Sequence, residues 1–194
     1  MIKAILFDCF GVVLTDALQQ IRADLERVDP EGAKEVAGLV AANNRGLLHP
    51  AESNERIAHI LGLSTEEFRG RVAEGEVRNE QLLSYILKLR KTYLTAMLSN
   101  IAGSSLRRRF PDNELNIYFD KIVASGDIGY AKPEPEAYEF AIQALGVLPS
   151  ECVFIDDRDH FCSAAQAHGM KAIVYTDFAQ FKHELEHILA NTKD

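Results

Sequence analysis

The chain has 194 residues, of which 47% are hydrophobic and 26% are charged, and its formal net charge is −8. This length and balance suit one α/β core, with or without a small inserted domain. The negative charge argues against nucleic acid or an anionic membrane surface as a partner. Three cysteines without CxxC spacing favour a reducing compartment, and the N-terminal apolar run is too short to span a bilayer. We therefore expect a cytoplasmic protein.

The first predicted element is a strand over residues 2–7 (IKAILF), which is apolar throughout, as in a strand buried on both faces. The period then changes, and only helical patterns follow between residues 16 and 91. The first helix begins near Asp16, which forms a capping-box pattern with Gln19. Further helical segments are predicted over residues 33–40, 52–61, 64–72 and 79–90.

Strand and helix patterns alternate in the rest of the chain. Strands are predicted over 93–98, 119–124, 152–155 and 172–175, and helices over 104–110, 134–145, 160–168 and 178–190. Such alternation indicates a parallel sheet with right-handed crossovers. We therefore predict an α/β protein with a Rossmann-like, three-layer core formed by residues 1–15 and 84–194. A helical cap domain over residues 16–83 is inserted after the first strand.

Polar residues follow the predicted strands at the points where those strands end. In open α/β sheets, ligands bind beyond the carboxyl ends of the strands, so these side chains are expected to converge. Each alone has an ordinary structural explanation, such as a helix cap or a turn, but their joint occurrence in sheet order is hard to attribute to chance. The residues concerned are Asp8, the pair Ser99 and Asn100, Lys132, and the pair Asp156 and Asp157.

These residue types together favour metal-assisted chemistry on an anionic substrate. Three neighbouring carboxylates repel one another unless a cation neutralises them. Oxygen ligands without histidine or cysteine favour Mg²⁺. With the metal screening a phosphate, Asp8 could attack phosphorus as a nucleophile. Lys132 would hold the incoming charge, while Ser99 and backbone amides of the loop after Asp8 would donate hydrogen bonds to phosphoryl oxygens.

Four segments resemble the motifs of the haloacid dehalogenase-like hydrolases: FDCFGVV (7–13), LSN (98–100), GYAKPEPEAY (129–138) and FIDDRDHFCSAAQAHGM (154–170). The resemblance implies a Rossmann-like core with a C1-type cap and a phosphorylated small molecule as substrate. It assigns Asp8 as the nucleophile and Lys132 as the charge clamp. Phosphate binding is assigned to Ser99, Asn100 and the loop at Phe10 and Gly11. The metal ligands are assigned as Asp8, Asp156, Asp157 and the main-chain carbonyl of Phe10.

Phe10 departs from the phosphatase pattern, in which an aspartate at this position acts as general acid and base. Three interpretations follow. The first is a phosphatase similar to the bacterial α-glucose-1-phosphate phosphatases, which acts on small substrates such as sugar phosphates. The second is a 2-haloacid dehalogenase, although these enzymes are metal-independent and lack the paired acid. The third is a weakly active or inactive protein that binds a ligand or partner.

Two basic features remain after the motifs have been assigned. Arg45 of the predicted cap lies beside a glycine and is a candidate for substrate contact, although an exposed loop position explains it equally well. The run Arg107–Arg109 could attract a phosphorylated substrate, but it is interpreted as a solvated helix face. The sequence leaves open whether the protein is a monomer or a dimer.

Overall fold

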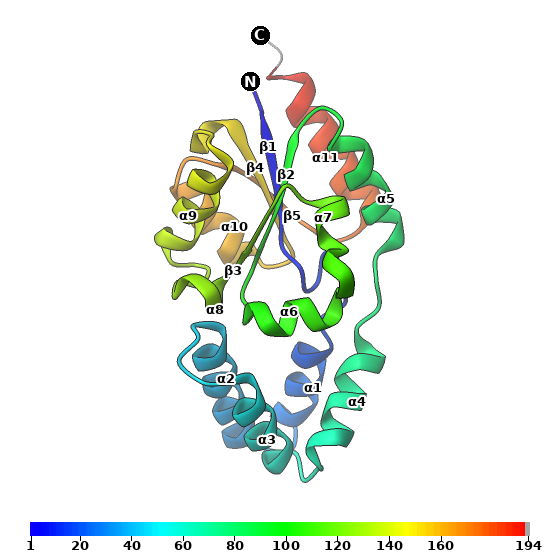
Figure 1. Cartoon of the computed structure of the whole chain (residues 1–194), viewed down its shortest axis with the longest axis vertical. Helices are drawn as coiled ribbons and strands as arrows, with labels where there is room; N and C mark the ends of the chain where they lie inside the picture. Colours follow the sequence, from blue (N-terminus) through cyan, green and yellow to red (C-terminus); the bar gives the residue numbers. More distant parts are fainter. Residues whose placement is uncertain (193–194) are drawn as a thin grey trace.

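Five parallel strands form the centre of the molecule (Figure 1). The computed structural model describes residues 1–192 and orders these strands β3-β2-β1-β4-β5. The central strand, β1, pairs with β2 on one side and with β4 on the other. The predicted α/β class is confirmed. The strands are β1 (Ala4–Phe7), β2 (Leu94–Ser99), β3 (Lys121–Ala124), β4 (Cys152–Asp156) and β5 (Lys171–Val174).

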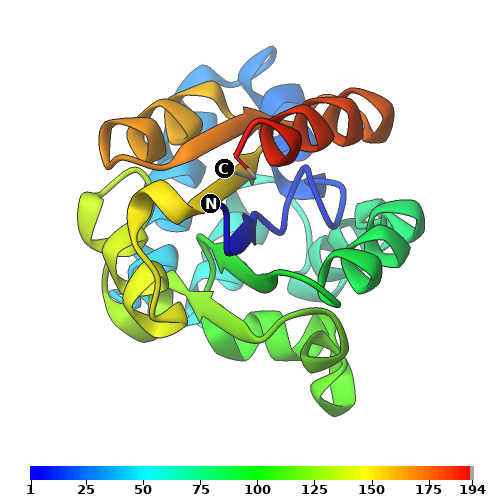
Figure 2. The same ribbon diagram turned by 90° about the horizontal axis from the view of Figure 1, so that it is seen from above.

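Helices cover both faces of this sheet, which gives the predicted three layers (Figure 2). All four side chains of β1 are buried, and they alternate between two hydrophobic clusters. Ile5 and Phe7 belong to the cluster on one face, and Ala4 and Leu6 to the cluster on the other. The first cluster includes residues of α5 (Glu80–Leu89), α6 (Gly103–Arg109), α7 (Leu115–Tyr118) and α11 (Phe178–Ala190). The second includes residues of α9 (Pro135–Leu145) and α10 (Asp159–Ala167).

Four further helices form a separate unit beyond the carboxyl ends of the strands, while the N-terminus and the end of α11 lie at the opposite end (Figure 1). The unit has its own hydrophobic cluster, which is built around Val36, Leu39, Ile57 and Phe68. Its helices are α1 (Ala17–Glu26), α2 (Pro30–Asn44), α3 (Pro50–Ile60) and α4 (Thr65–Gly75). Helix α5, by contrast, packs against the sheet from Leu82 onward. The division into domains at residues 15 and 84 stays a prediction.

The two chain segments that connect the helical unit to the core run side by side. Leu14 forms an antiparallel bridge with Arg78. The backbone N–H of Thr15 donates to the Val77 carbonyl over 3.0 Å, and the Val77 N–H donates to the Thr15 hydroxyl over 2.7 Å. The helical unit is therefore joined to the core by one short, paired connection.

Two short helices were not predicted, namely α7 and α8 (Ser125–Ile128), each of four residues. Segments of this length contain only about one helical turn, so no apolar periodicity can reveal them. No helix within residues 1–192 is both long enough and apolar enough to cross a membrane.

Asn79 fastens the start of α5 to the loop that follows β1. Its side-chain oxygen accepts a hydrogen bond from the Leu82 N–H over 3.1 Å and so caps the helix. Its amide nitrogen donates to the Val12 carbonyl over 3.1 Å and to the Tyr175 hydroxyl over 2.7 Å. This one side chain therefore links α5, the loop after β1 and the end of β5.

We predict that Asn79→Ala lowers the free energy of unfolding by about 2–3 kcal/mol, because it removes a helix cap and two further hydrogen bonds. Urea unfolding followed by circular dichroism measures the change. Ser64→Ala removes only the capping box of α4 and should cost about 1 kcal/mol. Equal losses in the two variants would show that the contacts to Val12 and Tyr175 contribute nothing.

Candidate active site

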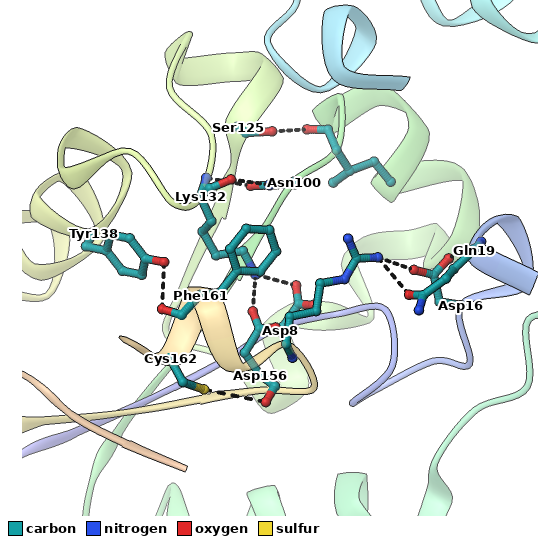
Figure 3. Close-up of polar contacts among 12 residues, drawn as sticks. Asp8, Asp16, Gln19, Asn100, Ser125, Lys132, Tyr138, Asp156, Phe161 and Cys162 are labelled. Atoms are coloured by element: carbon teal, nitrogen blue, oxygen red, sulfur yellow. Dashed lines mark hydrogen bonds and ion pairs between the residues drawn. The ribbon is translucent and has the colours of Figure 1, made fainter. Parts of the chain in front are cut away.

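The ammonium group of Lys132 lies between two buried carboxylates (Figure 3). Its Nζ is 2.7 Å from Oδ1 of Asp8 and 2.6 Å from Oδ2 of Asp156, and the lysine side chain is fully buried. The same Nζ lies 5.2 Å from the ring centroids of Phe154 and Phe161, which enclose it on its apolar sides. The loop after β3 thus meets the ends of β1 and β4 at one point, as the order of the strands predicts.

Asn100 holds the backbone of Lys132 in place. Its amide nitrogen donates to the Lys132 carbonyl, and its oxygen accepts from the Lys132 N–H, both over 2.8 Å. The side chain predicted to bind phosphate therefore makes its contacts with the lysine loop (Figure 3). One amide hydrogen remains for a ligand. Asn100 is thus placed to position Lys132, which sequence reasoning did not anticipate.

The three predicted carboxylates form one cluster. Asp8, Asp156 and Asp157 each offer an oxygen atom, and these atoms lie within 4.8 Å of one another. Within the described residues, Oδ1 of Asp157 is buried and has no hydrogen-bond partner. Lys132 compensates only one of the three negative charges when all are ionised, which leaves a net charge of two. The donor atoms, the orphaned oxygen and the residual charge all fit a divalent cation with oxygen ligands.

Gly11 lies at the edge of this cluster, against Asp157. Gly11 has a φ of +87°, and a Cβ atom there would collide with the carboxyl group of Asp157. Only glycine therefore allows this close approach. The Gly11 N–H donates to the Leu14 carbonyl over 2.6 Å, so binding phosphate through it would require sharing that hydrogen bond.

Ser99 is fully buried, and its hydroxyl has no partner among residues 1–192, which leaves it free to donate to a ligand.

Burial and neighbouring charges shift the pKa values of Asp8, Asp157 and Lys132. Burial, together with the charge of Asp156, raises the pKa of Asp8 from 3.8 to about 7, although Lys132 opposes the rise. Burial and Asp156 likewise raise the pKa of Asp157 from 3.8 to about 6. Burial disfavours the charged lysine, but Asp8 and Asp156 outweigh it and hold the pKa of Lys132 above its ordinary value. Asp8 and Asp157 are therefore destabilised as anions, whereas Lys132 stays charged.

A cavity of about 370 Å³ opens between this cluster and the helical unit. Asp8, Phe10, Ser99, Asn100 and Lys132 line its core side. This volume suits a small metabolite.

Arg45 is not among the residues that line this cavity. Its guanidinium forms an ion pair with Glu134 at 3.0 Å and is half-exposed. The neighbouring Ser125 hydroxyl donates to the Asn44 carbonyl, so this part of α2 rests on α8 and on the lysine loop. The substrate contact of Arg45 stays a prediction. In this structure its charge pairs with Glu134 and holds α2 against the core.

Sequence reasoning missed several arginines that line the cavity. Arg109 forms a two-fold hydrogen bond with Glu76, at 2.7 Å for each contact, and its guanidinium carbon lies 5.3 Å from the Phe10 ring centroid. Arg158 forms an ion pair with Asp16 at 2.9 Å. The motifs gave no signal for these residues, because their positions depend on how separate helices pack. The full set comprises Arg22, Arg69, Arg108, Arg109 and Arg158.

The sequence model of the haloacid dehalogenase-like hydrolases matches residues 2–169. The chain belongs to this family. This confirms the resemblance to the haloacid dehalogenase-like hydrolases that the four motifs indicated. The narrower subgroup, similar to the α-glucose-1-phosphate phosphatases, stays a prediction.

Individual relatives agree with this family. The chain is 31% identical over 208 aligned residues to a D-ribitol-5-phosphate phosphatase of Bacteroides thetaiotaomicron, covering 97% of this chain and 99% of the relative. A family enzyme from the same organism, solved in complex with magnesium and inorganic phosphate, matches with a TM-score of 0.73 and 25% identity, covering 93% of this chain and 99% of that one. An L-2-haloacid dehalogenase of Xanthobacter autotrophicus shares the fold, with a TM-score of 0.62 and 20% identity, over 100% of this chain and 85% of that one.

We predict that Asp157→Asn stabilises the metal-free hydrolase at pH 8 by about 1–2 kcal/mol, after allowance for partial exposure. The folded-state pKa of Asp157 lies above the ordinary value of 3.8. Ionisation therefore costs folding free energy, and this cost is absent below pH 4 and complete above about pH 6. Urea unfolding in EDTA at pH 4 and pH 8 measures the difference between variant and wild type.

The matched control is Asp24→Asn, which neutralises an exposed aspartate of α1 and should change stability by less than about 0.5 kcal/mol at either pH. Destabilisation by Asp157→Asn at pH 8 would contradict the view that this cluster carries uncompensated negative charge.

Proposed function

We propose that this hydrolase is a magnesium-dependent phosphomonoester hydrolase for small phosphorylated molecules, with Asp8 as its nucleophile. The observation that carries the proposal is the carboxylate cluster, whose charge Lys132 neutralises only in part, at the base of a small cavity. The relative named as a phosphatase and the neighbour solved with magnesium and inorganic phosphate support it.

The metal would be held by Asp8, Asp156, Asp157 and the main-chain carbonyl of Phe10. When bound, magnesium supplies charge screening between the phosphate and the Asp8 carboxylate. Asp156 also has a structural task, because its two oxygens accept from the Lys132 ammonium and from the Arg158 N–H at 3.0 Å. Asp157, with its free Oδ1, contributes the oxygen that is least committed to protein contacts.

The reaction proceeds in two displacements at phosphorus. A carboxylate oxygen of Asp8 forms a bond to phosphorus as the bond to the ester oxygen breaks, which leaves an aspartyl-phosphate and an alkoxide that takes a proton from water to become the alcohol. Lys132 and the Ser99 hydroxyl stabilise the charge of the transferring group. Water then attacks the phosphorus, which regenerates the Asp8 carboxylate and releases inorganic phosphate.

Polar side chains on the helical side of the cavity support a sugar-like or polyol-like substrate. Gln19, Asn43 and Asn54 line its helical side and offer amide groups to hydroxyls. The relative named for D-ribitol 5-phosphate is consistent with this class. We also propose a cytoplasmic location, supported by the three cysteines, which are free and buried.

Substitution of the nucleophile tests the central assignment. We expect wild-type protein with Mg²⁺ to release phosphate from a panel of phosphomonoesters, EDTA to suppress this release, and Asp8→Asn to abolish it, because an amide is not a nucleophile here. Asp24→Asn should retain full activity. Metal-independent halide release from 2-haloacids, with no phosphate release, would instead assign the chain as a dehalogenase. No turnover in either assay, with measurable magnesium binding, would favour a binding protein.

The phenyl ring of Phe10 can neither give nor take a proton. General acid catalysis contributes about 10²–10⁴ in rate, so its loss should penalise poor leaving groups most. We expect kcat/KM to be at least about 100-fold higher for aryl, acyl or glycosyl phosphates than for primary alkyl phosphates of similar size. Phosphate release across such a series measures the dependence. Equal rates along the series would mean that another group in the cavity protonates the leaving oxygen.

A further inference from the structure

Cationic side chains outnumber acidic ones among the residues that line the cavity, if the carboxylate cluster at its base is left to the metal, although the protein as a whole has a net charge of −8. Each acidic residue that lines the cavity is engaged by a cation that also lines it. Lys132 binds Asp8 at 2.7 Å, Arg158 binds Asp16 at 2.9 Å, and Arg109 binds Glu76 at 2.7 Å. The remaining lining arginines are therefore not needed to neutralise the cavity walls.

Three arginines make up this surplus: Arg22, Arg69 and Arg108. Among residues 1–111 and 113–192, none of them forms an ion pair. Arg108 donates to the hydroxyl of Ser105 at 2.9 Å. The three side chains come from separate elements, since Arg22 lies on α1, Arg69 on α4 and Arg108 on α6.

Two of these arginines belong to the helical unit and not to the sheet edge that holds the carboxylate cluster. The group transferred to Asp8 already has Lys132 and Ser99 at that edge. Arg22 and Arg69 therefore face the part of a ligand that is not transferred. A guanidinium group matches carboxylate and phosphate oxygens through paired hydrogen bonds, and its charge is permanent.

We propose that the substrate is a phosphomonoester that carries a second anionic group, a carboxylate or a further phosphate, at the end remote from the bond that is cleaved. Arg22 and Arg69 bind this second group, with Arg108 adding positive charge from the core side. This assignment names the substrate class of the function proposed above and rests on it. It also gives the helical unit a means of discrimination, because a neutral polyol phosphate leaves the guanidinium groups without a partner.

A matched set of three esters tests the proposal, since they differ only at carbon 6. Glucose 1-phosphate is neutral there, glucuronic acid 1-phosphate has a carboxylate, and glucose 1,6-bisphosphate has a phosphate. Hydrolysis at carbon 1 is followed with Mg²⁺ by the formation of glucose, glucuronic acid or glucose 6-phosphate. We expect kcat/KM for at least one of the two esters with an anionic group at carbon 6 to exceed that for glucose 1-phosphate by about tenfold. The better of the two identifies the second group as carboxylate or phosphate.

Single variants connect the preference to the named residues. Arg22→Gln and Arg69→Gln should each reduce the ratio of kcat/KM values, anionic over neutral, by about three- to fivefold. Arg71→Gln is the matched control, because Arg71 is exposed on the same helix as Arg69 but does not line the cavity. It should leave the ratio unchanged. Raising the KCl concentration should lower the ratio in wild type, because salt screens the attraction.

The outcomes separate this inference from the proposed function. Equal hydrolysis of the neutral and anionic esters, or a ratio that neither Arg22→Gln nor Arg69→Gln alters, overturns the inference while phosphatase activity stands. If no ester is hydrolysed, the proposed function fails. In that case, calorimetry measures the binding of the three esters to the Asp8→Asn variant. The inference is overturned as well if neither glucose 1,6-bisphosphate nor glucuronic acid 1-phosphate binds more tightly than glucose 1-phosphate.

Discussion

The buried contact of Lys132 with Asp8 and Asp156 is the constraint on which the rest of the structure depends. A lysine side chain with no exposed surface is tolerated only when carboxylates and hydrogen bonds compensate its charge. These two carboxylates follow β1 and β4, whereas the lysine lies in the loop after β3. The sheet must therefore place three distant segments of the chain to within hydrogen-bond distance. The two hydrogen bonds between Asn100 and the Lys132 backbone extend this requirement to the end of β2.

The same cluster carries more negative charge than Lys132 can balance. The raised pKa values of Asp8 and Asp157 express this imbalance, because each carboxylate resists ionisation where it is buried beside another. Such an arrangement is unfavourable for the folded chain by itself but becomes favourable when a cation is added. The repulsion between the carboxylates lowers the folding stability of the metal-free protein, and its relief on binding strengthens the affinity for the cation.

The strand ends could be predicted from the sequence because each is an apolar run followed at once by a polar residue, and parallel strands end at one edge. That reasoning located Asp8, Ser99, Lys132, Asp156 and Asp157. It did not reveal that the Asn100 amide binds the Lys132 backbone, because side-chain contacts between two loops have no periodic pattern.

The arginines of the cavity escaped detection for a related reason. Arg108 and Arg109 follow Arg107 in a run that looks like a solvated helix face, and Arg22 and Arg69 lie on helices of the inserted unit. Whether a polar helix face meets water or a cavity depends on the packing of neighbouring helices. For Arg45, a basic residue beside glycine suggested a ligand contact, and the structure adds an ion pair with Glu134 that the sequence did not indicate.

The ion pairs of Arg45 with Glu134 and of Arg158 with Asp16 join the helical unit to the core on either side of the cavity. The covalent connection between the two parts is one short pair of adjacent segments, at Thr15 and Val77. Charged contacts between partly exposed groups weaken as ionic strength rises, whereas the hydrophobic clusters on both sides do not. The two ion pairs therefore hold the helical unit to the core less strongly as the salt content of the surrounding solution rises, while the uncharged contacts between the two parts are retained.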